Sequence, residues 1–138
     1  NGGQRFVVYD EAWRLMSYPS LLARMDAQWR LARHYGLANL LVFHKLTDLE
    51  NVGDSGSRMR ALASSLLANA ETRVVYRQES DQLGATAQTL GLTVTERSLL
   101  PGLGIGQGLW KIKDRSFVVQ HQLHPAELEL FDTRARML

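Results

Sequence analysis

The sequence contains no cysteine, few prolines and no long apolar run. Without cysteine, the chain cannot form a disulfide framework, a thiolate nucleophile, or a zinc or iron–sulfur site that needs thiolates. No apolar run approaches the roughly 20 residues that cross a bilayer, and residues 1–5 lack the apolar stretch of a signal peptide. With 3 prolines and 11 glycines in 138 residues, collagen-like and low-complexity chains are also excluded. The composition predicts a soluble, globular, single domain, and the cytoplasm is the expected compartment.

An excess of charge of one sign is also missing. The 16 basic residues stand against 14 acidic ones, so the net charge is only +2 although the pI is about 9.2. Such a balance does not by itself indicate nucleic-acid binding. Arginine outnumbers lysine by 13 to 3. The arginine fork suits phosphate and carboxylate, but a high genomic G+C content produces the same bias, and we favour that explanation.

Segments typical of strands and of helices alternate along most of the chain. Short apolar runs rich in β-branched residues predict buried strands at residues 5–9, 39–44 and 72–76. Apolar residues at helical spacing predict helices at residues 20–32, 58–70, 80–90 and 95–100. This alternation predicts an α/β fold with a parallel sheet flanked by helices.

Capping and turn residues place the boundaries of these segments. Ser20 and Thr95 are expected to cap helices at their N-termini, whereas Gly36 and Gly91 are expected to end them. Residues 47–56 are rich in Asp, Asn and Gly and predict a loop.

The C-terminal part has a different pattern. Apolar and polar residues alternate over residues 108–113 and 116–123, on either side of Lys113-Asp114-Arg115, which predicts an antiparallel hairpin. His124-Pro125 then precedes a short helical segment at residues 126–131.

Two adjacent carboxylates directly follow the first predicted strand. Asp10 and Glu11 come after the apolar run Phe6-Val7-Val8-Tyr9, and ligands of open α/β sheets bind beyond the carboxyl ends of the strands. Asp10 would hold Mg²⁺, mostly through water, beside a bound triphosphate, and Glu11 would orient and deprotonate the attacking water. The alternative is a strand that simply ends in two solvated acids.

His44 closes the next predicted strand and should emerge at the same edge of the sheet. A polar group there can contact a γ-phosphate, although a histidine that merely ends a strand is an equal alternative. Arginines that act on a neighbouring subunit's phosphates are common in phosphoryl transfer, and Arg58 and Arg60 follow the predicted loop from which they could reach an adjacent protomer. Arg33, Arg73 and Arg77 are further candidates, and each could equally be an ordinary solvated arginine.

A phosphate-binding loop is absent from the sequence. The alternating glycines of residues 102–108 precede a predicted hairpin rather than a helix, and no Gly-Lys-Ser/Thr occurs. The chain therefore carries residues for the metal and water half of a nucleotide site without residues for the phosphate half.

Four segments, in the same order, resemble the C-terminal part of the VirB4/TraC-type ATPases. They are residues 5–16 (RFVVYDEAWRLM), 33–36 (RHYG), 41–48 (LVFHKLTD) and 67–76 (LANAETRVVY). The tail from Gly108 to Met137 resembles the closing hairpin and terminal helix of actinobacterial members. These proteins are RecA-like P-loop motors of the HerA/FtsK group that energise conjugation and type IV secretion.

The resemblance implies a function and a site. Asp10 and Glu11 would be the Walker B pair, with ATP and Mg²⁺ as cofactors, and His44 stands where the group usually has a glutamine. Self-association as a hexamer, other secretion or conjugation subunits as partners, and a position at the cytoplasmic face of the membrane are also implied. Direct contact with DNA stays open.

The missing Walker A segment limits what this chain does alone. In the family that segment precedes the Walker B strand, so we interpret residues 1–138 as the C-terminal portion of a single RecA-like ATPase domain. We expect this portion not to hydrolyse ATP by itself.

Two other interpretations remain. Residues 10–13 (DEAW) also resemble the DEAx box of superfamily 2 helicases, although the place of their Ser-Ala-Thr motif here has His-Lys-Leu-Thr. Alternatively, the chain is a non-catalytic docking or regulatory module of a secretion machine that contributes arginines to another subunit's site.

Overall fold

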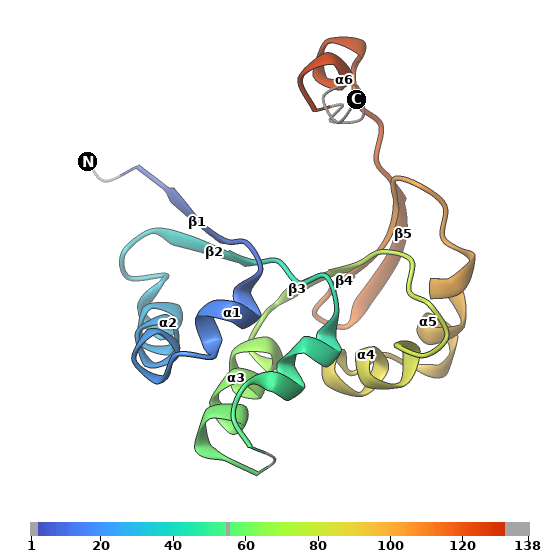
Figure 1. The fold of residues 1–138 in the computed structure, drawn as a ribbon. Coiled ribbons are helices and arrows are strands. Elements are labelled where there is room, and N and C mark those ends of the chain that lie inside the picture. The colour runs from blue at the N-terminus through green and yellow to red at the C-terminus, as the bar shows by residue number, and fades with distance from the viewer. Residues whose placement is uncertain (1–2, 55, 132–138) are drawn as a thin grey trace, which may run out of the picture.

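The computed structural model describes residues 3–54 and 56–131. In it, five strands form two small sheets, and helices α1 to α5 lie on one side of them (Figure 1). Helix α6 stands apart at the end of the chain (Figure 1). No described helix combines the length and the apolar character that crossing a membrane requires.

The first sheet is a parallel pair. Strand β1 (Arg5–Tyr9) pairs with β2 (Leu37–Leu41), in a register that sets Arg5 opposite Leu37 and Tyr9 opposite Leu41. Helices α1 (Ala12–Met16) and α2 (Pro19–Leu31) connect the two strands and complete a β–α–β unit. The predicted bounds of β1 are confirmed, but the prediction that this strand is buried is wrong, because the side chains of Phe6 and Val8 are 74% and 58% exposed.

Strand β2 begins and ends earlier than the predicted residues 39–44. Gly36 adopts φ +61°, so the chain leaves the helical segment in one turn and Leu37 already pairs with β1. The strand then ends with its partner, because β1 is only five residues long. His44 therefore lies on the connection after β2 rather than at the last position of the strand.

The second sheet is antiparallel. Strand β4 (Gln107–Ile112) lies between β3 (Thr72–Val75) and β5 (Arg115–Gln120). The hairpin predicted in the tail is confirmed, and Lys113 adopts φ 56° in its turn. The prediction that the third strand belongs to a parallel sheet with the first two is wrong, because the hydrogen-bonded partner of β3 is β4. An apolar run predicts a strand but not which strand pairs with it.

Several helix boundaries differ from the prediction because of local capping. The N-cap of α2 is Tyr18 rather than Ser20, since Pro19 occupies the first helical turn, where its fixed φ is favourable. The N-cap of α5 (Val94–Leu99) is Thr93 rather than Thr95, and Thr93 forms a capping box with Glu96. The predicted stop of α4 (Leu83–Leu90) at Gly91 is confirmed, with φ +61°.

The remaining helices follow the predicted spacing. Ser57 caps α3 (Arg58–Ala68), and its side chain accepts a hydrogen bond from the Arg60 N–H. The predicted loop at residues 47–56 contains a 3-10 helix, η1 (Leu46–Asn51). A second, η2 (Leu100–Gly102), extends α5, and α6 (Pro125–Phe131) follows the hairpin.

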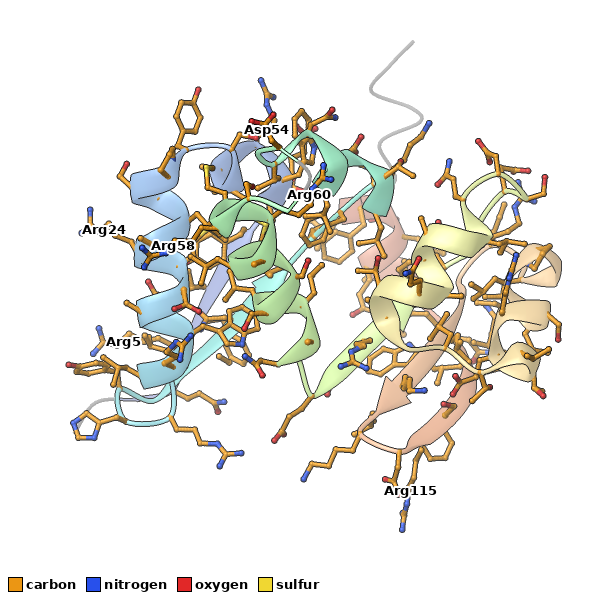
Figure 2. All side chains as sticks on the ribbon, turned by 90° about the horizontal axis from the view of Figure 1, so that it is seen from below. Arg5, Arg24, Asp54, Arg58, Arg60 and Arg115 are labelled. Atoms are coloured by element: carbon orange, nitrogen blue, oxygen red, sulfur yellow. The ribbon has the colours of Figure 1, made fainter. Side chains whose placement is uncertain are left out.

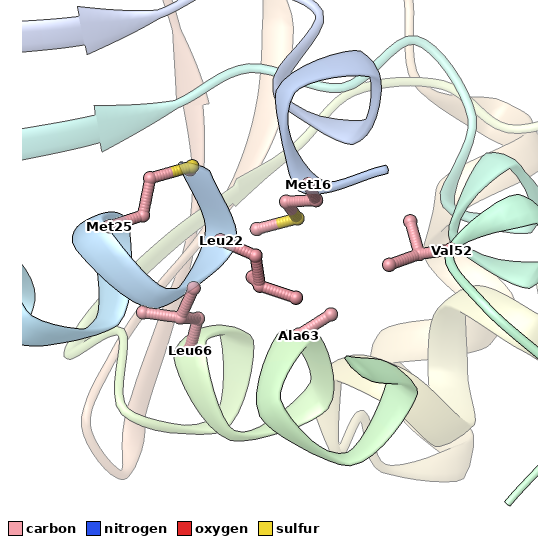
Figure 3. Close-up of a cluster of buried hydrophobic side chains, with 6 residues drawn as sticks. All are labelled: Met16, Leu22, Met25, Val52, Ala63 and Leu66. Carbon is pink, nitrogen blue, oxygen red and sulfur yellow. The ribbon is translucent and has the colours of Figure 1, made fainter. Parts of the chain in front are cut away.

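Two apolar clusters hold the helices against the sheets. Figure 3 shows the larger one, in which side chains of α1, α2, α3 and the end of η1 meet: Met16, Leu22, Met25, Val52, Ala63 and Leu66. Tyr9 and Leu41 pack against it from the ends of the parallel strands. The smaller cluster joins Val75 and Leu109 to Leu100 and Leu103. The larger cluster fixes α1, and with it the turn that carries Asp10 and Glu11.

Candidate functional site

The carboxyl ends of the two parallel strands form the candidate site. Asp10 and Glu11 follow β1, and His44 lies on the connection after β2. The His44 Nε2 atom lies 3.8 Å from the Glu11 Oε1 atom. The structure therefore brings together three of the residues selected from the sequence.

Backbone hydrogen bonds join the segment that follows β1 to the segment that follows β2. The Val42 N–H donates to the Tyr9 carbonyl at 3.0 Å, and the Ala12 N–H donates to the Val42 carbonyl at 3.1 Å. Ala12 is fully buried at the start of α1. The strand ends, not flexible side chains, thus set the position of Glu11 relative to the β2 connection.

Glu11 has an unusual backbone conformation. As the N-cap of α1 it adopts φ 49° and ψ 48°, in the left-handed region, and its N–H donates to Asp10 Oδ1 at 3.0 Å. For a residue other than glycine such a conformation costs on the order of 1–3 kcal/mol and is concentrated at functional sites. The turn redirects the chain from strand to helix within one residue and keeps both carboxylates at the sheet edge.

A residue that was not selected from the sequence also contacts the pair. The Arg14 Nη1 atom donates to Glu11 Oε2 at 3.2 Å, so the two oxygens of Glu11 face different partners, Arg14 and His44. The i,i+3 spacing of Glu11 and Arg14 at a helix start was the available signal. Both side chains are partly exposed, so this ion pair contributes little to stability. It supplies a cation that neutralises Glu11 and a donor that can turn toward an incoming anion.

Asp10 and Glu11 suit a magnesium ion better than a metal ion that is bound by three or more protein side chains. Within residues 3–54 and 56–131, no three side chains of His, Asp or Glu gather as a metal-binding group. Mg²⁺ keeps several waters and is commonly held by one or two carboxylates together with substrate phosphates. Asp10 and Glu11 offer such a pair of exposed or half-exposed carboxylates at one edge.

The candidate arginines lie elsewhere on the fold. Arg58 is exposed on the first turn of α3, and Arg60 is half-buried there. Figure 2 shows Arg60 on the same side of the molecule as Asp54, which lies in the loop before α3. In the described chain, the ionic partners of Glu11 are Arg14 and His44, so α3 does not bring its arginines to the carboxylate pair.

The other three arginines have structural partners. Arg33 forms an ion pair with Glu71 at 3.1 Å, and Arg77 lies 3.6 Å from Glu79. Arg73 donates to the carbonyls of Ala68 and Leu90, which ties β3 to the ends of α3 and α4.

Comparison with known proteins identifies the fold. No family model and no curated protein matches this sequence. Among solved structures, the chain superposes on VirB4 of Thermoanaerobacter pseudethanolicus with a TM-score of 0.75 over 91% of its length, at 20% sequence identity. The chain has the fold of part of VirB4.

The match with VirB4 covers 33% of that protein's length. At this level of identity the likeness concerns the fold, and it confirms the prediction of a partial P-loop NTPase core with parallel strands, flanking helices and a C-terminal antiparallel hairpin. The matched protein also bears the name of the family that the sequence motifs resemble.

Proposed function

We propose that residues 1–138 belong to a VirB4-like motor ATPase that energises type IV secretion or conjugative DNA transfer. One observation carries the proposal: within a fold shared with VirB4 over 91% of the chain, Asp10, Glu11 and His44 meet at the carboxyl edge of two parallel strands. Ligands of open α/β sheets bind at this edge. In this proposal the chain is the C-terminal portion of one RecA-like domain and supplies the Walker B half of its nucleotide site.

Each residue of the carboxyl edge has a distinct proposed role. Asp10 would hold Mg²⁺, whose charge offsets the negative charge of the ATP phosphates. Glu11 would accept a proton from the attacking water, for which a positioned carboxylate with access to solvent is suited. His44 would donate a hydrogen bond toward the γ-phosphate, and its contact with Glu11 would hold both groups in place. Arg14 would move from Glu11 to the phosphate anion.

Arg58 is the better candidate for a residue that acts on a neighbouring subunit. It is exposed on the first turn of α3, whereas Arg60 is half-buried. Guanidinium groups supplied in trans stabilise transition-state charge in phosphoryl transfer. This role requires self-association, and the proposed form is a hexamer at the cytoplasmic face of the membrane. Other subunits of the secretion machinery would be its partners, and direct contact with DNA stays open.

The first measurement is the intact mass of the native gene product in its source cell. A product much heavier than 15.6 kDa is expected, because the proposal needs a phosphate-binding loop that this sequence lacks. A native product of 15.6 kDa would contradict the ATPase and favour a docking or regulatory module.

The decisive variant is Glu11→Gln in the native-length protein. Removing a general base costs about 100-fold or more in kcat, whereas ATP binding should stay close to normal because the amide keeps the shape and polarity of the side chain. Steady-state phosphate release and equilibrium binding of ATP measure the two effects separately. Glu129→Gln is the matched control, since Glu129 is exposed on α6, which stands apart from the carboxyl edge (Figure 1). Full turnover in Glu11→Gln would refute the role of Glu11.

A further inference from the structure

Both oxygens of the Glu11 carboxylate face a basic side chain. The Arg14 Nη1 atom donates a hydrogen bond to Glu11 Oε2 at 3.2 Å, and the His44 Nε2 atom lies 3.8 Å from Glu11 Oε1. A general base needs an open lone pair within hydrogen-bond reach of the water that it deprotonates. The contact with Arg14 therefore restrains Glu11, because it occupies one of the two oxygens that could accept this proton.

The backbone of Arg14 is fixed, whereas its side chain can change position. The Arg14 N–H donates to the Glu11 carbonyl at 2.9 Å, and Ala12 and Met16 anchor α1 with fully buried side chains. The Arg14 side chain itself is 68% exposed. Exposed side chains change rotamer within nanoseconds, so the guanidinium can leave Glu11 without any movement of the helix.

The ion pair between Arg14 and Glu11 is weak enough to be displaced. Both side chains are in contact with water, and exposed ion pairs of this kind contribute little free energy. A phosphate group is a stronger partner for Arg14, because the guanidinium can bind two of its charged oxygens at once. A nucleotide phosphate that comes within reach should therefore draw Arg14 away from Glu11.

We propose that Arg14 is the residue through which the site distinguishes ATP from ADP, because it restrains Glu11 until the γ-phosphate draws it away. In the proposed function, Glu11 accepts a proton from the water that attacks the γ-phosphate, so this phosphate is the one expected beside Glu11 and Arg14. ADP lacks it. The inference rests on the proposed function and adds to it a control of when Glu11 can act.

The Arg14 side chain has two positions in this proposal. Without a γ-phosphate, in the free or the ADP-bound protein, it bonds to Glu11 as it does in this structure. With ATP it bonds to the γ-phosphate and leaves Glu11 Oε2 open to water. A ligand shifts an equilibrium between two states only through different contacts with them, and the γ-phosphate supplies that difference. Its loss after hydrolysis lets Arg14 return to Glu11.

Equilibrium binding of two nucleotides to the native-length protein tests the discrimination. With Mg²⁺ present, Arg14→Ala should weaken binding of the non-hydrolysable ATP analogue AMP-PNP by about tenfold or more, because a charge-assisted hydrogen bond to the γ-phosphate is lost. Binding of ADP should change by less than about twofold. Arg14→Lys should recover most of the loss, since it keeps the charge. Equal weakening for both nucleotides, or no weakening, would overturn the proposal.

Arg115→Ala is the matched control for Arg14→Ala. Arg115 is also an exposed arginine, but it lies at the start of β5 in the second sheet (Figure 2). This variant should bind AMP-PNP and ADP as the unmodified protein does. A loss of AMP-PNP binding as large as that of Arg14→Ala would count against a specific role of Arg14, because it would show a general effect of positive charge.

A double-mutant cycle tests the restraint of Glu11. Glu11→Gln should tighten AMP-PNP binding by about two- to fivefold, because Arg14 no longer has to leave an ion pair. In the Arg14→Ala background, the same change at Glu11 should give a clearly smaller gain. Equal gains in both backgrounds would refute the restraint, since they would reflect only the repulsion between the Glu11 charge and the phosphates.

These binding measurements need no turnover, so the two proposals can fail separately. A selective loss of AMP-PNP binding in Arg14→Ala, in a protein that does not hydrolyse ATP, would refute the proposed ATPase and leave the role of Arg14 standing. An active ATPase in which Arg14→Ala binds both nucleotides normally would do the reverse. A native-length protein that binds neither nucleotide would refute both.

Discussion

Replacing Glu96 by glutamine should destabilise the C-terminal half of the fold. Glu96 lies on α5 and is 9% exposed. Its carboxylate accepts hydrogen bonds from the Thr93 N–H at 2.7 Å, from Lys111 Nζ at 2.9 Å and from the Ser116 hydroxyl. The carboxylate thus joins the N-terminus of α5 to both strands of the hairpin. Glutamine keeps the size of the side chain but removes the charge and one acceptor oxygen.

The magnitude follows from the pKa of Glu96. Burial raises this pKa, but the hydrogen bonds from Ser116, Thr93 and Lys111 together with the Lys111 charge outweigh burial and lower the pKa from 4.5 to about 2. A shift of that size corresponds to about 3 kcal/mol in favour of the folded state when the carboxylate is ionised. Glu96→Gln also leaves the Lys111 ammonium, with a side chain 12% exposed, without its counterion. We expect a loss of about 3 kcal/mol at pH 7.

The pH dependence has a definite sign. Because the folded-state pKa lies below the unfolded-state value, the contribution of Glu96 is fully present above about pH 4.5 and is lost as the pH falls toward 2. The difference in stability between the unmodified protein and Glu96→Gln should therefore shrink over this interval.

Equilibrium urea unfolding at a series of pH values measures both effects. Tryptophan fluorescence is a suitable signal, since Trp110 lies next to Lys111 on β4. Glu79→Gln is the control and should change stability by less than about 1 kcal/mol, because Glu79 is 74% exposed. A loss below about 1 kcal/mol for Glu96→Gln, or a loss that is equal at pH 7 and pH 3, would refute the reasoning.

Three further predictions concern the carboxyl edge and the core. Asp10→Asn should raise the Mg²⁺ concentration for half-maximal ATPase activity by about tenfold or more, and an unchanged magnesium titration would contradict its role. His44→Gln should retain turnover better than His44→Ala, because glutamine, the usual residue of the resembled family, can still donate a hydrogen bond; equal kcat values would remove the donor role. Leu66→Ala should lower the free energy of unfolding by about 2–5 kcal/mol, because Leu66 is fully buried. Calorimetry measures this loss, and a loss clearly below that range would contradict the prediction.

Much of the local structure could be predicted from the sequence. The strand at Arg5–Tyr9, the helix stop at Gly91 and the hairpin turn near Lys113 all follow from short-range properties: apolar runs, backbone freedom and alternation. The adjacency of Asp10 and Glu11 after a strand likewise identified the carboxylate pair. Its proximity to His44 could be expected because parallel strands end at one edge.

Cap positions were harder to predict because several residues compete for them. Thr93 and Thr95 are both suitable N-cap residues, and the capping box with Glu96 decides for Thr93. The same Glu96 is held by Lys111 and Ser116 from a distant hairpin, which no local pattern reveals. Arg14 was overlooked for a different reason, since an i,i+3 ion pair depends on where the helix begins.

By itself, the sequence determined which segments form strands and helices, which residues follow each strand, and which family the motifs resemble. Only the tertiary structure decided that β3 pairs with β4, that β2 keeps an open edge beside it, and that Glu11 adopts a left-handed conformation. The physical reason is that propensity and apolar spacing act over a few neighbouring residues. Strand pairing depends instead on hydrogen bonds between segments far apart in the chain, and their partners are settled only when the whole sheet packs.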